Sequence, residues 1–153
     1  MKIEVINNEV EIAVAVKYDA LDFSNMGNTM GEGYEKLFNY ISQCGEKVSG
    51  APYCRYTNPS EDFMKFDIEL GIPVGTPIPE KDDIYMSKTI SGKAITAIHK
   101  GAYKDIEKTY TPMMQYLADN NLESTGVYYD YYISDPSVTP EDELLTKVVF
   151  LIK

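Results

Sequence analysis

A carboxylate among tyrosines is the part of the sequence best suited to chemistry. Residues 125–136 (TGVYYDYYISDP) are mainly aromatic and β-branched, which predicts a strand that ends at the Ser-Asp-Pro turn. Alternate side chains of a strand point to opposite faces, so Tyr128, Asp130 and Tyr132 share one face. This grouping indicates a pocket in which the carboxylate balances a cation and the phenol rings contact it. The simpler alternative is an acid on an exposed sheet face.

A second candidate acid lies in residues 66–72, where apolar and polar residues alternate as in a half-buried strand. Glu69 and its neighbour Asp67 share the polar face of this strand. Glu69 either takes part in the pocket or pairs with a lysine across the sheet, and the sequence leaves both interpretations open. Three further tyrosines are predicted to line a cleft or to pack beneath it: Tyr53, Tyr56 and Tyr103.

The composition disfavours several classes of protein. The 153 residues carry a net charge of −10, which opposes direct nucleic-acid binding and favours cationic ligands, although solubility alone also explains the charge. The single histidine, His99, argues against a histidine-built metal site and a Ser-His-Asp triad, and we expect it to be structural. The cysteines, Cys44 and Cys54, have no metal-type spacing. No metal, cofactor or catalytic residue is therefore predicted.

The chain is predicted to be cytoplasmic. Its first 30 residues are acidic throughout, unlike a signal peptide, and no window holds the 18 or more apolar residues of a membrane span. Two isolated cysteines are most simply explained as reduced thiols.

The pattern of apolar residues predicts the order strand, helix, strand, strand, twice. A loop is expected over residues 19–33, and Pro112 is expected to kink or split the second helix. The helices are predicted at about 34–44 and 103–120. The strands are predicted at 10–16, 51–56, 66–72, 93–99, 125–133 and 144–152, with a short edge strand near 84–86.

An internal repeat supports this order. A shift of 76 residues carries the apolar positions Tyr34, Leu37, Phe38 and Ile41 onto Tyr110, Met113, Met114 and Leu117. The same shift carries Tyr53, Cys54 and Tyr56 onto Tyr129, Asp130 and Tyr132. The constant offset indicates a duplication with halves of about 1–76 and 77–153.

The duplication predicts a single α+β domain over residues 1–153. Its two units are expected to form one antiparallel sheet with two helices on one face and a ligand cleft at the pseudo-twofold. The helices are expected to cover the aliphatic strand faces. The opposite face is then expected to carry Ala13, Ala15, Asp67, Glu69, Tyr128, Asp130 and Tyr132.

Several stretches, in their order and spacing along nearly the whole chain, resemble the GyrI-like small-molecule-binding family. This family is also described as the AraC-type effector-binding domain, and it includes the drug-binding halves of MerR- and AraC-type multidrug regulators. The matching stretches are residues 30–38 (MGEGYEKLF), 52–56 (PYCRY), 66–74 (FDIELGIPV), 91–94 (SGKA), 97–103 (AIHKGAY), 132–136 (YISDP) and Thr146.

The resemblance implies a stand-alone protein that senses or sequesters lipophilic, cationic aromatic compounds. It implies that a buried acid meets the positive charge, and Asp130 occupies the place of the family's usual glutamate. No DNA-binding domain is expected, because the chain starts directly with the effector domain. Two alternatives remain: a hydrolase of electrophilic small molecules that uses Asp130 and Tyr132, and an acidic module that binds a protein partner such as a regulator or DNA gyrase. The oligomeric state is not predicted.

Overall fold

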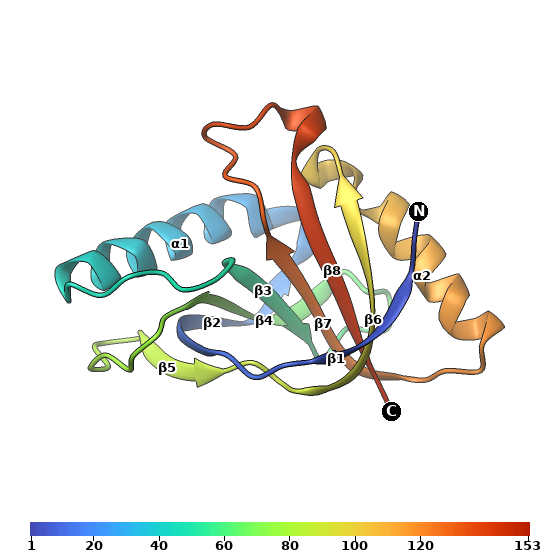
Figure 1. Cartoon of the computed structure of the whole chain (residues 1–153), viewed down its shortest axis with the longest axis horizontal. Helices are drawn as coiled ribbons and strands as arrows, with labels where there is room; N and C mark the ends of the chain where they lie inside the picture. The colour runs from blue at the N-terminus through green and yellow to red at the C-terminus, as the bar shows by residue number, and fades with distance from the viewer. The chain divides into compact units, whose positions relative to one another are not determined.

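The order strand, helix, strand, strand occurs twice along the chain. The computed structural model describes all 153 residues, which divide into two compact units (Figure 1). One unit is Glu9–Ile90, and the other combines Met1–Asn8 with Ser91–Lys153. The predicted α+β class and the duplicated order of elements are confirmed. No helix is long and apolar enough to cross a membrane.

The unit Glu9–Ile90 contains four antiparallel strands in the order β3-β4-β2-β5 and one helix. Alternate residues of β2, such as Val14 and Val16, are buried with the helix side of the sheet. Leu70 of β4 packs against Gly33 of α1, so Glu69 next to it points to the opposite face. The elements are β2 (Ile12–Asp22), α1 (Met26–Gln43), β3 (Tyr53–Thr57), β4 (Lys65–Pro73) and β5 (Tyr85–Lys88).

The other unit contains four antiparallel strands in the order β1-β6-β8-β7 and one helix. Its elements are β1 (Glu4–Asn8), β6 (Gly92–Lys100), α2 (Glu107–Asp119), β7 (Ser124–Tyr132) and β8 (Leu145–Ile152). The core between α2 and the sheet is formed by Ile95, Ala97, Ile106, Met113, Leu117, Val148, Phe150 and Ile152. The strand β1 belongs to this unit because it pairs with β6.

The last two strands pair in the same way within each unit. In β3 and β4, Tyr53 lies opposite Gly71 and Arg55 lies opposite Glu69. In β7 and β8, Tyr129 lies opposite Val149 and Tyr131 lies opposite Lys147. Glu69 therefore corresponds to Lys147, and Arg55 corresponds to Tyr131. The ammonium of Lys147 lies 5.7 Å from the centroid of the Tyr131 ring.

Local differences from the predictions occur at both helices. Residues 19–33 are not a loop, because β2 runs to Asp22, a 3-10 turn follows, and α1 begins at Met26. Of the two effects expected of Pro112, the split does not occur, since α2 is continuous from Glu107–Asp119. Two of the apolar helix positions related by the 76-residue shift, Phe38 and Met114, are 42% and 39% exposed.

The glycines of α1 explain why this helix was predicted to start too late. Glycine usually weakens a helix, and three occur in its first half. A side chain at Gly33 would meet Leu70 Cδ1 at 2.5 Å and the Tyr18 hydroxyl at 3.1 Å, whereas a side chain at Gly31 would meet nothing within 4 Å. Gly33 thus permits close packing of the helix on the sheet, which offsets its low helix propensity.

We expect Gly33→Ala and Gly31→Ala to change stability in opposite directions. Gly31→Ala should stabilise the protein by about 0.5–1 kcal/mol through helix propensity. Gly33→Ala should destabilise it by about 1 kcal/mol because Leu70 and Tyr18 must move. Chemical denaturation of the two variants measures both effects, and an equal gain in stability would contradict the proposed close packing.

Candidate functional site

The best-formed polar site is built around Glu69 of β4, whose side chain is only 2% exposed. The hydroxyls of Tyr85 and Ser87 donate to its Oε1 at 2.7 and 2.8 Å. The hydroxyl of Tyr53 donates to Oε2 at 2.8 Å, and Arg55 Nη1 lies 3.5 Å from the same oxygen. Both carboxylate oxygens are therefore held by donors, which is what a buried charge requires. These five side chains are called the Glu69 cluster below.

Small residues on neighbouring strands allow this cluster to assemble. Ala15 and Ala13 of β2 lie opposite Tyr85 and Ser87 of β5, and both alanines are fully buried. Because they are small, the hydroxyls of β5 reach across β2 to Glu69 on β4. Larger side chains at these two positions would separate the donors from the carboxylate.

Gly71 likewise makes room for the side chain of Tyr53. The two residues lie opposite each other in the β3–β4 register. A β-carbon at Gly71 would meet the Tyr53 ring at 2.2–2.5 Å, so the ring lies directly over the glycine backbone. The tyrosine hydroxyl reaches Glu69 from this position. The glycine is thus required by contact with Tyr53 and not by a turn.

Tyr85 stays protonated in this environment. Burial, followed by its hydrogen bond to Glu69 and the negative charge of that carboxylate, raises the pKa of Tyr85 well above its usual value. The phenol is therefore held as a neutral hydrogen-bond donor.

Asp130 of β7, the other predicted acid, is also 2% exposed. Unlike Glu69, it lies on the sheet face that is covered by a helix. The hydroxyl of Tyr110, on α2, donates to Asp130 Oδ2. Asp130 lies opposite Val148, which belongs to the core under α2. The expectation that the polar side chains of β7 face away from the helix is therefore wrong. Its physical reason is that Tyr110 supplies the polar partner that an acid needs beneath a helix.

The predicted tyrosines are divided among different groups. Tyr53 belongs to the Glu69 cluster. Tyr128 packs edge-to-face on Phe150 at a centroid distance of 5.0 Å, and Tyr132 packs edge-to-face on Tyr103 at 5.3 Å. Tyr56 packs edge-to-face on Phe66 at 5.4 Å, on the helix side of its sheet. Of the seven predicted site residues, only Glu69 and Tyr53 belong to the Glu69 cluster.

Asp67 and His99 have local structural partners. Asp67 accepts hydrogen bonds from Asn58 and from the backbone of Ala20, and these hold its pKa below the usual value. His99 Nε2 lies 2.9 Å from the carbonyl of Ala102, which can only accept, so this nitrogen carries the proton. His99 Nδ1 lies 2.8 Å from the Thr109 hydroxyl. These contacts fix the histidine between β6 and α2, which agrees with a structural role.

Sequence reasoning missed Arg55, Tyr85, Ser87 and Tyr110. Tyr85 and Ser87 are two residues apart on β5, which places them on one face, and the buried alanines Ala13 and Ala15 share this spacing on β2. The spacing therefore places the two hydroxyls on one face of their strand, but only the fold shows that they lie beside Glu69.

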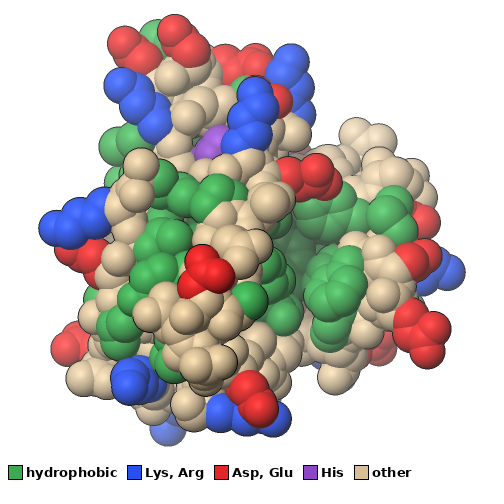
Figure 2. All heavy atoms as spheres, turned by 90° about the vertical axis from the view of Figure 1, so that its right-hand side faces the viewer, with side chains coloured by type: hydrophobic (Ala, Val, Ile, Leu, Met, Phe, Trp, Pro, Cys, Tyr) green, Lys and Arg blue, Asp and Glu red, His purple; other side chains and the backbone are tan.

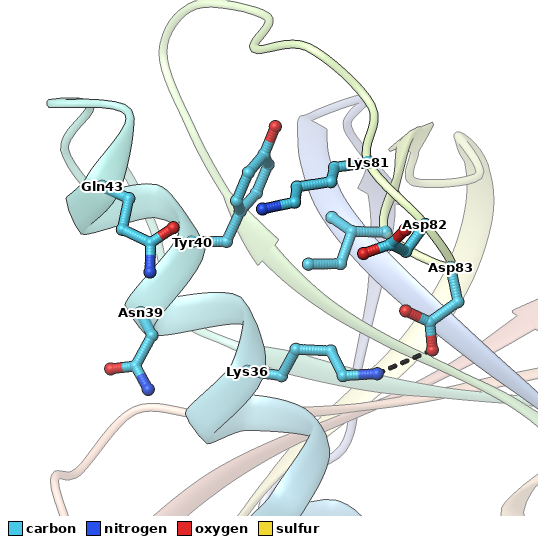
Figure 3. Close-up of a pocket in the computed structure, with 8 residues that line it drawn as sticks. Lys36, Asn39, Tyr40, Gln43, Lys81, Asp82 and Asp83 are labelled. Carbon is cyan, nitrogen blue, oxygen red and sulfur yellow. Dashed lines mark hydrogen bonds and ion pairs between the residues drawn. The ribbon is translucent and has the colours of Figure 1, made fainter.

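A separate groove lies between α1 and residues 81–84 (Figure 3). It encloses about 300 Å³, and Lys36 reaches across it to Asp83 at 2.7 Å. Both of these side chains are well exposed, and Tyr40, which also lines the groove, donates its hydroxyl to the Pro79 carbonyl. The groove therefore offers only solvated charges, and a ligand would gain less from them than from a buried carboxylate.

Comparison with known proteins identifies the family. The model of the GyrI-like small molecule binding domain matches residues 1–153, so the chain belongs to this family. A comparison with curated protein sequences finds no match.

Solved structures show the same fold at low sequence identity. The C-terminal domain of EcmrR is 20% identical with a TM-score of 0.81, and the match covers 99% of this chain and 97% of that one. The match to EcmrR in a complex with DNA covers only 57% of that longer chain. SAV2435 bound to tetraphenylphosphonium is 11% identical with a TM-score of 0.69, covering 100% and 94%. A hydrolase from Listeria innocua is 14% identical with a TM-score of 0.69, covering 99% and 92%.

We expect Gly71→Ala to destabilise the protein by about 2–3 kcal/mol, because the Tyr53 ring must leave its position and its hydrogen bond to Glu69 is lost. Gly75→Ala is the control, since a β-carbon there meets nothing within 4 Å. Chemical denaturation measures both variants. A Gly71→Ala protein as stable as the control would refute the packing of Tyr53 on this glycine.

Stability should also fall at high pH in a way that depends on Tyr85. The folded-state pKa of Tyr85 is raised, so its contribution is complete below the ordinary value of 10 and is lost as pH rises above it. The free energy of unfolding should therefore fall less in Tyr85→Phe than in the wild type between about pH 9 and about pH 11. Equal falls in the two proteins would show that Tyr85 ionises alike in the folded and unfolded states.

Proposed function

We propose that this GyrI-like domain binds lipophilic aromatic cations and that Glu69 supplies the negative charge that holds them. The single observation that carries the proposal is a carboxylate, 2% exposed, that accepts hydrogen bonds from three hydroxyls and pairs with Arg55 on the sheet face opposite α1. Such a charge is poorly solvated, so its attraction for a cation is less screened than that of a surface acid. The phenol ring of Tyr85, which is only partly buried, supplies aromatic surface beside it.

Asp130, the other buried acid, has a structural role in this proposal. Its hydrogen bond from Tyr110 joins β7 to α2, and Tyr128 beside it packs on the core residue Phe150. These contacts favour a role in holding the helix to the sheet. A ligand that meets Asp130 must first disturb that packing, whereas the Glu69 cluster faces away from its own helix.

The sensing or sequestering role proposed here is also supported by the family and by a solved relative that contains tetraphenylphosphonium. The hydrolase alternative, which uses Asp130 and Tyr132, is weaker, because Asp130 accepts a hydrogen bond from Tyr110 on the face under α2 and Tyr132 packs on Tyr103. The protein-interaction alternative needs a continuous charged surface. On the face drawn in Figure 2, acidic and basic side chains are interspersed around hydrophobic ones.

Calorimetric titration with tetraphenylphosphonium tests the proposal. We expect binding to the wild type and a loss of about tenfold or more in affinity for Glu69→Gln, which keeps the shape of the side chain and removes its charge. Asp130→Asn is the matched control, since it makes the same chemical change at the other buried acid. Asp130→Asn should lower the melting temperature of the protein but leave its affinity for tetraphenylphosphonium nearly unchanged.

Two results would contradict this assignment. Absence of binding by the wild type at tens of micromolar, about the range expected for a weak site, would refute the proposed function. A loss of affinity confined to Asp130→Asn would show that Asp130, and not Glu69, is the acid that pairs with the cationic ligand.

A further inference from the structure

Arg55 is the only arginine in the chain, and it lies against the buried acid. The β3–β4 register places Arg55 directly opposite Glu69. Its Nη1 lies 3.5 Å from Glu69 Oε2, and its side chain is 23% exposed, against 2% for the carboxylate. The guanidinium therefore lies between the buried charge and solvent, in a place set by the backbone.

The charges within the cluster are already balanced. Tyr53, Tyr85 and Ser87 donate to Glu69 as neutral hydroxyls, so Arg55 is the member that compensates the negative charge. A cationic ligand that joined the cluster would add a second positive charge beside one carboxylate. Two cations sharing one acid repel each other, which cancels much of the attraction that the acid provides.

The ion pair between Arg55 and Glu69 is a long one. A well-formed pair between guanidinium and carboxylate has nitrogen–oxygen distances of about 2.7–2.9 Å and is frequently bidentate. The contact of Arg55 is longer than this, and part of its side chain already reaches solvent. The three hydroxyls remain on Glu69 when the guanidinium departs, so the carboxylate keeps its hydrogen bonds.

We propose that Arg55 is the resident cation of the Glu69 cluster and that a cationic ligand binds by displacing it. This inference rests on the proposed function and adds the step that sets its selectivity. Cations gain the charge of Glu69 only after they displace Arg55, so weakly binding cations are rejected. Neutral aromatic ligands gain nothing from the exchange.

Lys17 provides a matched control for Arg55. It lies opposite Glu69 on the other neighbouring strand, β2, but its side chain is exposed. Replacing it removes a positive charge at the same position along β4 without touching the Arg55–Glu69 contact. Any general effect of net charge on cation binding will appear in both variants, whereas an effect of displacement will appear in one.

The test compares the wild type, Arg55→Gln and Lys17→Gln by calorimetry with two probes of similar shape. These are tetraphenylphosphonium, a monocation, and triphenylphosphine oxide, which is neutral. We expect Arg55→Gln to bind the cation about fivefold more tightly, the gain from removing a partly exposed ion pair. Lys17→Gln should change the affinity by less than about twofold, and the affinity for the neutral probe should not depend on either substitution.

A second measurement uses the wild-type protein and does not depend on the folding of a variant. Because the chain has one arginine, its side-chain Nε–H gives one arginine signal in a nitrogen-edited NMR spectrum. Saturating tetraphenylphosphonium should move this signal towards that of a solvated arginine and speed its exchange with water. The neutral probe should leave it unchanged.

The outcomes separate the two proposals. Binding of the cation with no gain in Arg55→Gln and no movement of the arginine signal overturns the displacement and leaves the proposed function intact. Failure of the cation to bind both the wild type and Arg55→Gln overturns the function and the displacement together. Binding that appears only in Arg55→Gln overturns both, because the wild type then binds no cation and the ligand does not displace the arginine.

Discussion

The burial of Glu69 is the constraint on which the surrounding structure depends. A carboxylate 2% exposed must be surrounded by donors, because leaving an ion unpaired in a protein interior costs several kcal/mol. Its donors come from β3 and β5, on either side of the β4–β2 pair. The sequence satisfies this demand with small residues: Ala13 and Ala15 let the hydroxyls of β5 approach, and Gly71 makes room for a ring. The size of these residues is therefore part of the chemistry of the site.

Much of the fold follows from periodicity alone. The alternation in β4, the helical spacing in α1 and α2 and the 76-residue shift identify the order of elements and its duplication. The errors occur where tertiary contacts override local preference. Gly33 weakens a helix in isolation, but it allows Leu70 to pack closely. The β1 strand has little pattern of its own and is fixed by pairing with β6. Neither effect can be inferred from a short window of sequence.

The candidate site was harder to predict because alternation does not tell which face a helix covers. Both faces of β7 carry tyrosines, so the pattern gives no direction, and Asp130 was placed on the wrong one. Glu69 was on the correct face because its strand neighbours are aliphatic. Its partners were not predictable from spacing: Arg55, Tyr85 and Ser87 come from two strands that are joined to β4 only by the fold. The sequence is enough to pick out candidate acids, but their hydrogen-bond donors can be identified only when the strand register is known.

The contact between Lys147 and Tyr131 is the counterpart, in the other unit, of the Arg55–Glu69 pair. At the positions of Arg55 and Glu69, the other repeat has a tyrosine ring with an ammonium 5.7 Å from its centre. One copy thus holds its cation with an acid, and the other holds its cation with an aromatic face. The same backbone positions thus meet one electrostatic demand in two different ways. The strand register therefore sets where a cation lies in each unit, but it leaves open which kind of side chain holds that cation.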